Sequence, residues 1–208
     1  MNILFPKIEN YLSKLMVSDD AVLRDMEKHA AKSDFPIIGP AVGRLLFQYA
    51  RALQAQRIFE LGSGFGYSAL WFACAMPDEG QIYCTDFLPE NLHLAERYFD
   101  RAGLRKKLST LAGSALESLA KTDGEFDIIL MDIDKEIYPQ GFRQAWPRLR
   151  QGGMFIVDNT LWKGKVAEEN PDETTRNILE LTRLVFAQKD ALATLLPLRD
   201  GVIVAMKI

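Results

Sequence analysis

The chain has 208 residues, of which 48% are hydrophobic and 25% are charged, and its formal net charge is -3. A chain of this length fits one domain that can bury roughly 70% of the surface exposed by its unfolded form. The composition excludes a disordered or repeat protein, and the scattered Lys and Arg residues give no basic face for nucleic acid. We therefore expect one domain, residues 1–208, that acts on a small molecule.

The N-terminal stretch favours helices and shows no targeting signal. Apolar residues fall on one helical face at Ile8, Tyr11, Leu12, Leu15 and Met16. Asp19 and Asp20 are candidate caps of a second helix, and a third is predicted after the turn between Pro36 and Pro40. The helices within residues 1–35 are expected to pack on the domain. The stretch lacks the order of a signal peptide, and no uncharged apolar run reaches about 18 residues, so we expect a cytoplasmic protein without membrane contact.

Five short apolar runs are typical of buried strands. They are RIFEL (57–61), QIYCTD (81–86), LSTLA (108–112), FDIILMD (126–132) and GGMFIVD (152–158). Segments with helical spacing separate them, which predicts a parallel sheet covered by helices on both faces. The last runs, in ALATLLPLRDGVIVAMKI, are separated by only a few residues, so the sheet should end in an antiparallel hairpin. Cys74 and Cys84 form no C-x-x-C pair and are predicted to be free thiols.

A glycine-rich turn, ELGSGFGYSALWFA, follows the first strand. Gly62, Gly64 and Gly66 let the backbone turn sharply and approach a ligand, but their spacing departs from the G-x-G-x-x-G pattern of dinucleotide sites. Asp86 lies twenty residues beyond Gly66 at the end of the second strand, where an acid can bind ribose hydroxyls. A nucleoside-bearing cofactor is therefore predicted, although an isolated motif of this kind could merely join a strand to a helix.

A charged cluster, Asp132, Asp134 and Lys135, follows the fourth strand. Such charges are costly to bury unless they are paired or bind a cation, so the cluster is either a solvated loop or a site. Asp158 and Asn159 end the next strand, and neighbouring parallel strands open onto one crevice. Two carboxylates and an amide oxygen suit Mg²⁺. From the residues alone, caps or turns remain the alternative.

Three motifs together, ELGSGFGYSAL, MDIDKEIY and GGMFIVDNTLWKGKV, resemble the metal-dependent, S-adenosylmethionine-dependent O-methyltransferases of the catechol and caffeoyl-CoA type, in particular their small bacterial members. The resemblance covers the chain from about Pro36 to its end. It implies a Rossmann-like class I methyltransferase fold: a mostly parallel seven-stranded sheet, helices on both faces and a C-terminal antiparallel hairpin. It also implies methyl transfer to a hydroxyl of a catechol-like phenolic molecule, and a homodimer.

The resemblance implies a cofactor site for S-adenosylmethionine. Glu60 would lie near its amino-acid end, Ser68 would bind its carboxylate and Asp86 its ribose, and Ser114 with Ala115 would flank its adenine. The full predicted set is Ile38, Glu60, Gly62, Ser63, Ser68, Asp86, Ser114, Ala115, Asp132 and Asp134.

The resemblance also implies a metal site and a base. Asp132, Asp158 and Asn159 would bind a divalent cation, with Mg²⁺ preferred and Mn²⁺ or Ca²⁺ as alternatives. Lys135 would be the catalytic base. A phenol has a pKa of about 10, so both a metal ion and a base would favour its ionised, nucleophilic form.

Several roles stay open. Asp134 is expected either beside the cofactor or substrate or as a solvated helix cap, and Trp162 either in the wall of the substrate pocket or in a core or interface. His29 and His93 are predicted to be surface residues. Relatives often carry an Arg, an aromatic and an Asn near the substrate in the helix after the metal motif, whereas this chain reads NILELTRL (177–184), so the acceptor pocket should differ.

Two other functions compete with methyl transfer. An NAD-dependent oxidoreductase is disfavoured by the glycine spacing and by the lack of a hydride-transfer site. A noncatalytic nucleoside-cofactor-binding protein is disfavoured because Lys135 and all three predicted metal ligands are present.

Overall fold

The computed structural model describes residues 5–208, so the first four residues of the predicted domain and of its N-terminal stretch lie outside the described residues. The strands are β1 (Arg57–Leu61), β2 (Gln81–Asp86), β3 (Leu108–Ala112), β4 (Phe126–Met131), β5 (Leu149–Val157), β6 (Ala191–Leu196) and β7 (Val202–Lys207). The α-helices are α1 (Pro6–Leu15), α2 (Ala21–Ser33), α3 (Gly39–Ala52), α4 (Tyr67–Ala75), α5 (Pro89–Arg101), α6 (Ala115–Lys121), α7 (Tyr138–Ala145) and α8 (Glu173–Ala187).

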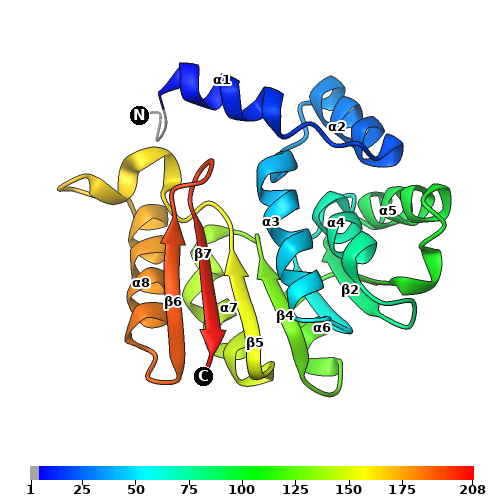
Figure 1. Cartoon of the computed structure of the whole chain (residues 1–208). Helices are drawn as coiled ribbons and strands as arrows, with labels where there is room; N and C mark the ends of the chain where they lie inside the picture. The colour runs from blue at the N-terminus through cyan, green and yellow to red at the C-terminus, as the bar shows by residue number, and fades with distance from the viewer. Residues whose placement is uncertain (1–4) are drawn as a thin grey trace.

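The strands form one seven-stranded sheet in the order β3-β2-β1-β4-β5-β7-β6 (Figure 1). The first five are mutually parallel, whereas β7 runs antiparallel to both β5 and β6. This confirms the predicted parallel sheet and its C-terminal hairpin. Strand order reverses at β1, so a crevice opens at the carboxyl ends of β1 and β4, where ligands bind in open sheets of this kind. The fifth strand begins at Leu149, earlier than predicted, because the polar residues before Gly152 also join the sheet.

Each face of the sheet carries its own core. Alternate residues of a strand point to opposite faces, and accordingly Ile58 of β1 packs among α2, α3, α4 and α5, whereas Phe59 packs among α6, α7 and α8. Both side chains are fully buried. Burying a side chain of this size stabilises the fold by about 1.5–3 kcal/mol. The sheet is therefore held rigidly from both sides, which fixes the positions of its strand ends.

The two N-terminal helices differ in how they pack. α2 begins at the predicted cap Asp20, whose carboxylate accepts hydrogen bonds from the N–H groups of Val22 and Leu23, and it buries three apolar side chains. α1 has the predicted helical face but buries no residue. Figure 1 shows both helices at the end of the sheet where the parallel strands terminate. They thus lie above the crevice.

Two smaller expectations concern thiols and membrane contact. Cys74 and Cys84 are free, as predicted. Among residues 5–208, no helix has the length and apolar character needed to cross a membrane.

Candidate functional site

The glycine-rich loop joins β1 to α4 along the floor of the crevice. Gly62 has a φ of +82°, and a Cβ atom there would lie only 2.3 Å from the backbone oxygen of Asp132. Gly66, which precedes α4, has a φ of +83°. Side chains are disfavoured in this left-handed region, and the space beside Gly62 is closed, so glycine is required at both positions. The loop can therefore lie directly against the end of β4.

Thr85 holds this loop in place, a role that the sequence analysis missed. Its side-chain oxygen accepts from the N–H of Gly62 at 3.0 Å and donates to the carbonyl of Glu60 at 2.8 Å. Its backbone carbonyl accepts from the N–H of Ser63 at 2.8 Å, and its own N–H donates to the Ser63 hydroxyl at 3.1 Å. The loop is thus ordered by β2 before any ligand binds. The only signal in the sequence is that Thr85 directly precedes Asp86.

A cavity of about 820 Å³ opens beside the loop. Its volume is within the usual range for small-molecule sites. Every predicted cofactor residue except Glu60 lines it, as do Lys135 and Asn159. Asp86 is held there by its Oδ1 atom, which accepts from the N–H of Leu88 at 2.8 Å and from Asn91 Nδ2 at 3.0 Å. The structure therefore brings the predicted cofactor residues together from five separate segments.

Glu60 is fully buried and does not line either cavity. Burial is the main cause that raises the pKa of its carboxyl to about 7, and the nearby Ser68 and Ser63 hydroxyls limit the rise. Its Oε2 accepts from the Cys84 thiol at 3.7 Å, whereas Oε1 has no partner. An acid in this environment is suited to a cationic partner.

The charged cluster lies at the ends of β4 and β5. Lys135 Nζ lies 2.9 Å from Asp132 Oδ1, donates to the carbonyl of Ile133 at 3.1 Å, and is 4.8 Å from the ring centroid of Tyr138. Tyr138 in turn donates its hydroxyl hydrogen to the carbonyl of Asp158 at 2.9 Å. The Lys135 side chain is only 12% exposed. The lysine is thus fixed beside the acids.

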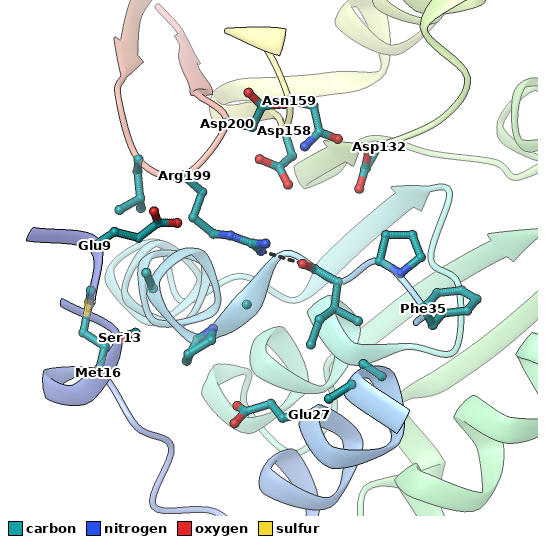
Figure 2. Close-up of a pocket in the computed structure, with 18 of the residues that line it drawn as sticks. Glu9, Ser13, Met16, Glu27, Phe35, Asp132, Asp158, Asn159, Arg199 and Asp200 are labelled. Carbon is teal, nitrogen blue, oxygen red and sulfur yellow. Dashed lines mark hydrogen bonds between the residues drawn. The ribbon is translucent and has the colours of Figure 1, made fainter. Parts of the chain in front are cut away.

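Asp158 carries the least compensated charge of this cluster. Burial and, as the next cause, the negative charge of Asp132 together raise the pKa of its carboxyl to about 7. Its Oδ1 is buried without a hydrogen-bond partner. Figure 2 shows the side chains of Asp132, Asp158 and Asn159 grouped at one end of a cavity. Two neighbouring acids, of which only Asp132 is paired with an ammonium, form a site with excess negative charge.

This donor set fits a hard divalent cation. Among residues 5–208, no group of three or more His, Cys, Asp or Glu side chains is placed to hold a metal ion. The predicted set is of another kind, since it contains two carboxylates and the amide of Asn159. Oxygen donors of these types suit Mg²⁺, and the unpartnered oxygen of Asp158 is an available ligand.

A second cavity, of about 690 Å³, is also lined by Asp132, Asp158 and Asn159 (Figure 2). Asp158 and Arg199 line it together with residues of α1 and α2. Both cavities are lined by Phe35, Pro36, Ile37, Asp132, Asn159, Lys163 and Asp200. The segment before α3 is therefore a common wall, and Asp132 and Asn159 are accessible from both cavities, whereas Lys135 lines only the larger and Asp158 only the smaller one.

The residues with open roles lie as follows. Asp134 is exposed, lines the larger cavity and precedes a short 3₁₀ helix (Lys135–Ile137) without making a side-chain cap bond. Trp162 also lines the larger cavity, and its ring centroid lies 5.9 Å from Lys135 Nζ. The stretch 177–184 lies within α8 and lines neither cavity.

The histidines differ in exposure. His93 is exposed, as predicted. His29 is only half-buried and packs edge-on against Phe65, with ring centroids 5.3 Å apart.

Comparisons with known proteins agree with this geometry. A family model described as O-methyltransferase matches residues 13–208. A catechol O-methyltransferase from Niastella koreensis is 33% identical over 178 residues, covering 83% of this chain and 80% of its own. The O-methyltransferase TomG from Streptomyces achromogenes, solved with SAM, has a TM-score of 0.86 at 26% identity, covering 97% of this chain and 96% of its own. An O-methyltransferase from Bacillus cereus, solved with SAH, has a TM-score of 0.86 at 26% identity and covers 97% of each chain.

The family match spans nearly the whole chain from the last turn of α1 onward, and it therefore begins ahead of the region that carries the motif resemblance. The fold, a seven-stranded mixed sheet with helices on both faces, is that of the Rossmann-like methyltransferases. This chain belongs to the O-methyltransferase family.

Proposed function

We propose that the protein transfers the methyl group of S-adenosylmethionine to one hydroxyl of a catechol-like aromatic molecule, with the help of a divalent cation. The observation that carries this proposal is that the charged cluster of Asp132, Asp158 and Lys135 lies where two cavities meet. One cavity contains the glycine-rich loop and Asp86. The solved relatives that contain SAM or SAH and the curated relative named catechol O-methyltransferase support it.

The larger cavity is proposed to hold the cofactor. Asp86 uses only Oδ1 in the bonds to Leu88 and Asn91, which leaves Oδ2 for a ribose hydroxyl. Ser68 and Ser63 line the cavity near the buried Glu60, whose carboxylate would attract the ammonium of the methionine part. Ser114 and Ala115 line it at the start of α6, where they would flank the adenine.

The smaller cavity is proposed to hold the acceptor, with a cation at Asp132, Asp158 and Asn159. Such an ion polarises a bound hydroxyl and lowers its pKa, which is the chemistry it would supply here. Lys135, in its neutral amine form, would receive the hydroxyl proton, and Asp132 and the Ile133 carbonyl hold its nitrogen in position. The acceptor oxygen then forms a bond to the methyl carbon as the carbon–sulfur bond breaks, leaving a neutral thioether.

The test is a methylation assay with a panel of catechols, caffeoyl esters and flavonoids, read by mass spectrometry. We expect a singly methylated product from at least one vicinal diol. EDTA should abolish turnover, and Mg²⁺ or Mn²⁺ should restore it, whereas S-adenosylhomocysteine should still bind. Full activity on a catechol after verified removal of metal would overturn the proposed role of the cation.

The cofactor assignment has its own test. S-adenosylhomocysteine should raise the melting temperature and NAD should not, because a ligand that binds only the folded state stabilises it by mass action. A shift with NAD alone would favour the oxidoreductase alternative. A homodimer is a further proposal, which the mass of the protein in solution would test.

A further inference from the structure

The β6–β7 turn, residues 197–201, contacts the loop that follows β5, residues 159–163. Three hydrogen bonds join them: Thr160 N–H to the Gly201 carbonyl (3.0 Å), Leu161 N–H to the Asp200 carbonyl (2.8 Å) and Lys163 N–H to Asp200 Oδ1 (2.5 Å). The approach is close, since a Cβ atom on Gly201 would lie 2.5 Å from Leu161 Cγ. The turn thus fixes the loop that carries Asn159.

The same turn contacts the segment that leads into α3, residues 35–39. Arg199 reaches across and donates from Nη1 to the carbonyl of Ile37 at 2.5 Å, a bond between residues 162 positions apart (Figure 2). Its guanidinium also closes the space beside Gly39, where a Cβ atom would lie 2.9 Å from Nη1. Arg199 therefore joins the C-terminal hairpin to the wall between the two cavities.

Backbone strain is concentrated at this junction. Six non-glycine residues in the described chain have a positive φ, and four belong to the turn or the loop: Asn159, Trp162, Lys163 and Arg199. Side chains disfavour this conformation, and strained residues persist only where surrounding contacts hold them, most often at functional sites. The hydrogen bonds of Asp200 and Gly201 supply such contacts here.

We propose that Arg199 and Asp200 are positioning residues that fix the positions of the two segments that both cavities share as walls. Asp200 fixes the loop with Asn159, and Arg199 fixes the 35–39 segment. Both elements line both cavities, so a shift of either would change the cofactor and acceptor sites together. The identity of the two ligands rests on the proposed function, but the positioning role does not.

Four variants test this role. Arg199→Ala removes the bond to Ile37, and Arg199→Lys keeps a positive charge and a donor. Asp200→Ala removes the acceptor for the Lys163 N–H, and Asp200→Asn keeps a side-chain oxygen there. The control is Arg57→Ala, because Arg57 also donates to a distant backbone carbonyl, that of Asp123 at 2.7 Å, but at the start of β1, away from both cavities.

Two measurements do not depend on catalytic activity: the rate of hydrogen–deuterium exchange and the affinity for S-adenosylhomocysteine. We expect Arg199→Ala to speed exchange in residues 35–39 and to weaken S-adenosylhomocysteine binding by up to about tenfold, the effect of losing one charged hydrogen bond. Asp200→Ala should speed exchange in residues 159–163. Arg199→Lys and Asp200→Asn should recover most of the loss, and Arg57→Ala should change neither exchange in these segments nor affinity.

Turnover then distinguishes positioning from simple stabilisation. On an accepted catechol, Arg199→Ala should raise the KM for the acceptor, and Asp200→Ala should lower kcat by roughly tenfold. Lowered melting temperatures with unchanged exchange, affinity, KM and kcat would overturn the proposal. If the unaltered protein methylates no acceptor, the proposed function fails, yet exchange and S-adenosylhomocysteine affinity still decide the role of Arg199 and Asp200.

Discussion

The two halves of the crevice carry buried acids in different surroundings. At the ends of β1 and β2, Thr85 satisfies the loop backbone, and Glu60 is a fully buried acid with an unpartnered oxygen. At the ends of β4 and β5, Asp132 is paired with Lys135, whereas the neighbouring Asp158 has an unpartnered oxygen. The first half is ordered in the absence of a ligand, whereas the second retains charge repulsion that a cation would relieve.

Because their surroundings differ, Glu60 and Asp158 are expected to have different roles although both are carboxylic acids. Burial raises the pKa of both Glu60 and Asp158 to about 7, but only Asp158 has a second acid, Asp132, as a major cause. A lone buried carboxylate suits a monovalent ammonium, and a pair suits a divalent metal ion. Mutations that remove one acid at a time should therefore affect binding and chemistry separately.

The largest expected effect is that of Asp158→Ala. Removing a metal ligand should lower kcat/KM on a catechol by roughly 10³-fold, as the loss of a main electrostatic contact at the reacting oxygen does elsewhere. S-adenosylhomocysteine affinity, measured by calorimetry, should change little. Asp100→Ala is a control, because Asp100 is an exposed acid that lines neither cavity and should leave the rate intact. An Asp158→Ala variant with normal turnover would remove this residue from the metal site.

Next in size is Lys135→Ala. Loss of a general base should lower kcat by about 10²-fold, and the loss should diminish as the pH approaches the pKa of the acceptor hydroxyl. Metal binding should persist, since Asp132 would then have no competing ammonium. Lys135→Arg keeps the charge but cannot accept a proton at neutral pH, so it should be equally slow. Normal turnover by the arginine variant would show that Lys135 supplies charge only.

The third prediction concerns how the free energy of unfolding depends on pH, and it tests Glu60 alone. Its pKa is about 7 in the folded protein against an ordinary 4.5, so the folded state binds the proton more tightly. The contribution to stability is complete below pH 4.5 and is lost as the pH rises through 7, a change of roughly 3 kcal/mol for a shift of this size. Glu60→Gln should remove that pH dependence and make the ligand-free protein more stable at pH 8. Urea unfolding at pH 5 and pH 8 measures it, and identical pH dependence in both proteins would contradict the assignment.

Local patterns in the sequence predicted the strands, the glycine-rich loop and the hairpin, because alternation, glycine and turn residues act over a few positions. They did not predict contacts between distant segments. Thr85 is an ordinary strand residue until β2 pairs with β1, and Arg199 is an ordinary turn residue until it reaches Ile37. The division into two cavities depends on the same contacts. Similarly, helical spacing in α1 predicted the helix but not how little of it is buried.

The smallest effect expected is that of Asp86→Ala, and it tests the ordered half of the crevice. Losing the acid that faces the ribose should weaken S-adenosylhomocysteine binding by about tenfold, near 1.4 kcal/mol, measured by calorimetry. Asn91→Ala removes one donor to Asp86 Oδ1, but the Leu88 N–H still holds the carboxylate, so affinity should fall by only about twofold. Because neither residue belongs to the charged cluster, kcat with saturating cofactor should be unchanged in both variants. A tenfold loss from Asn91→Ala would instead show that the carboxylate depends on Asn91 for its position, and that this half is less ordered than its hydrogen bonds indicate.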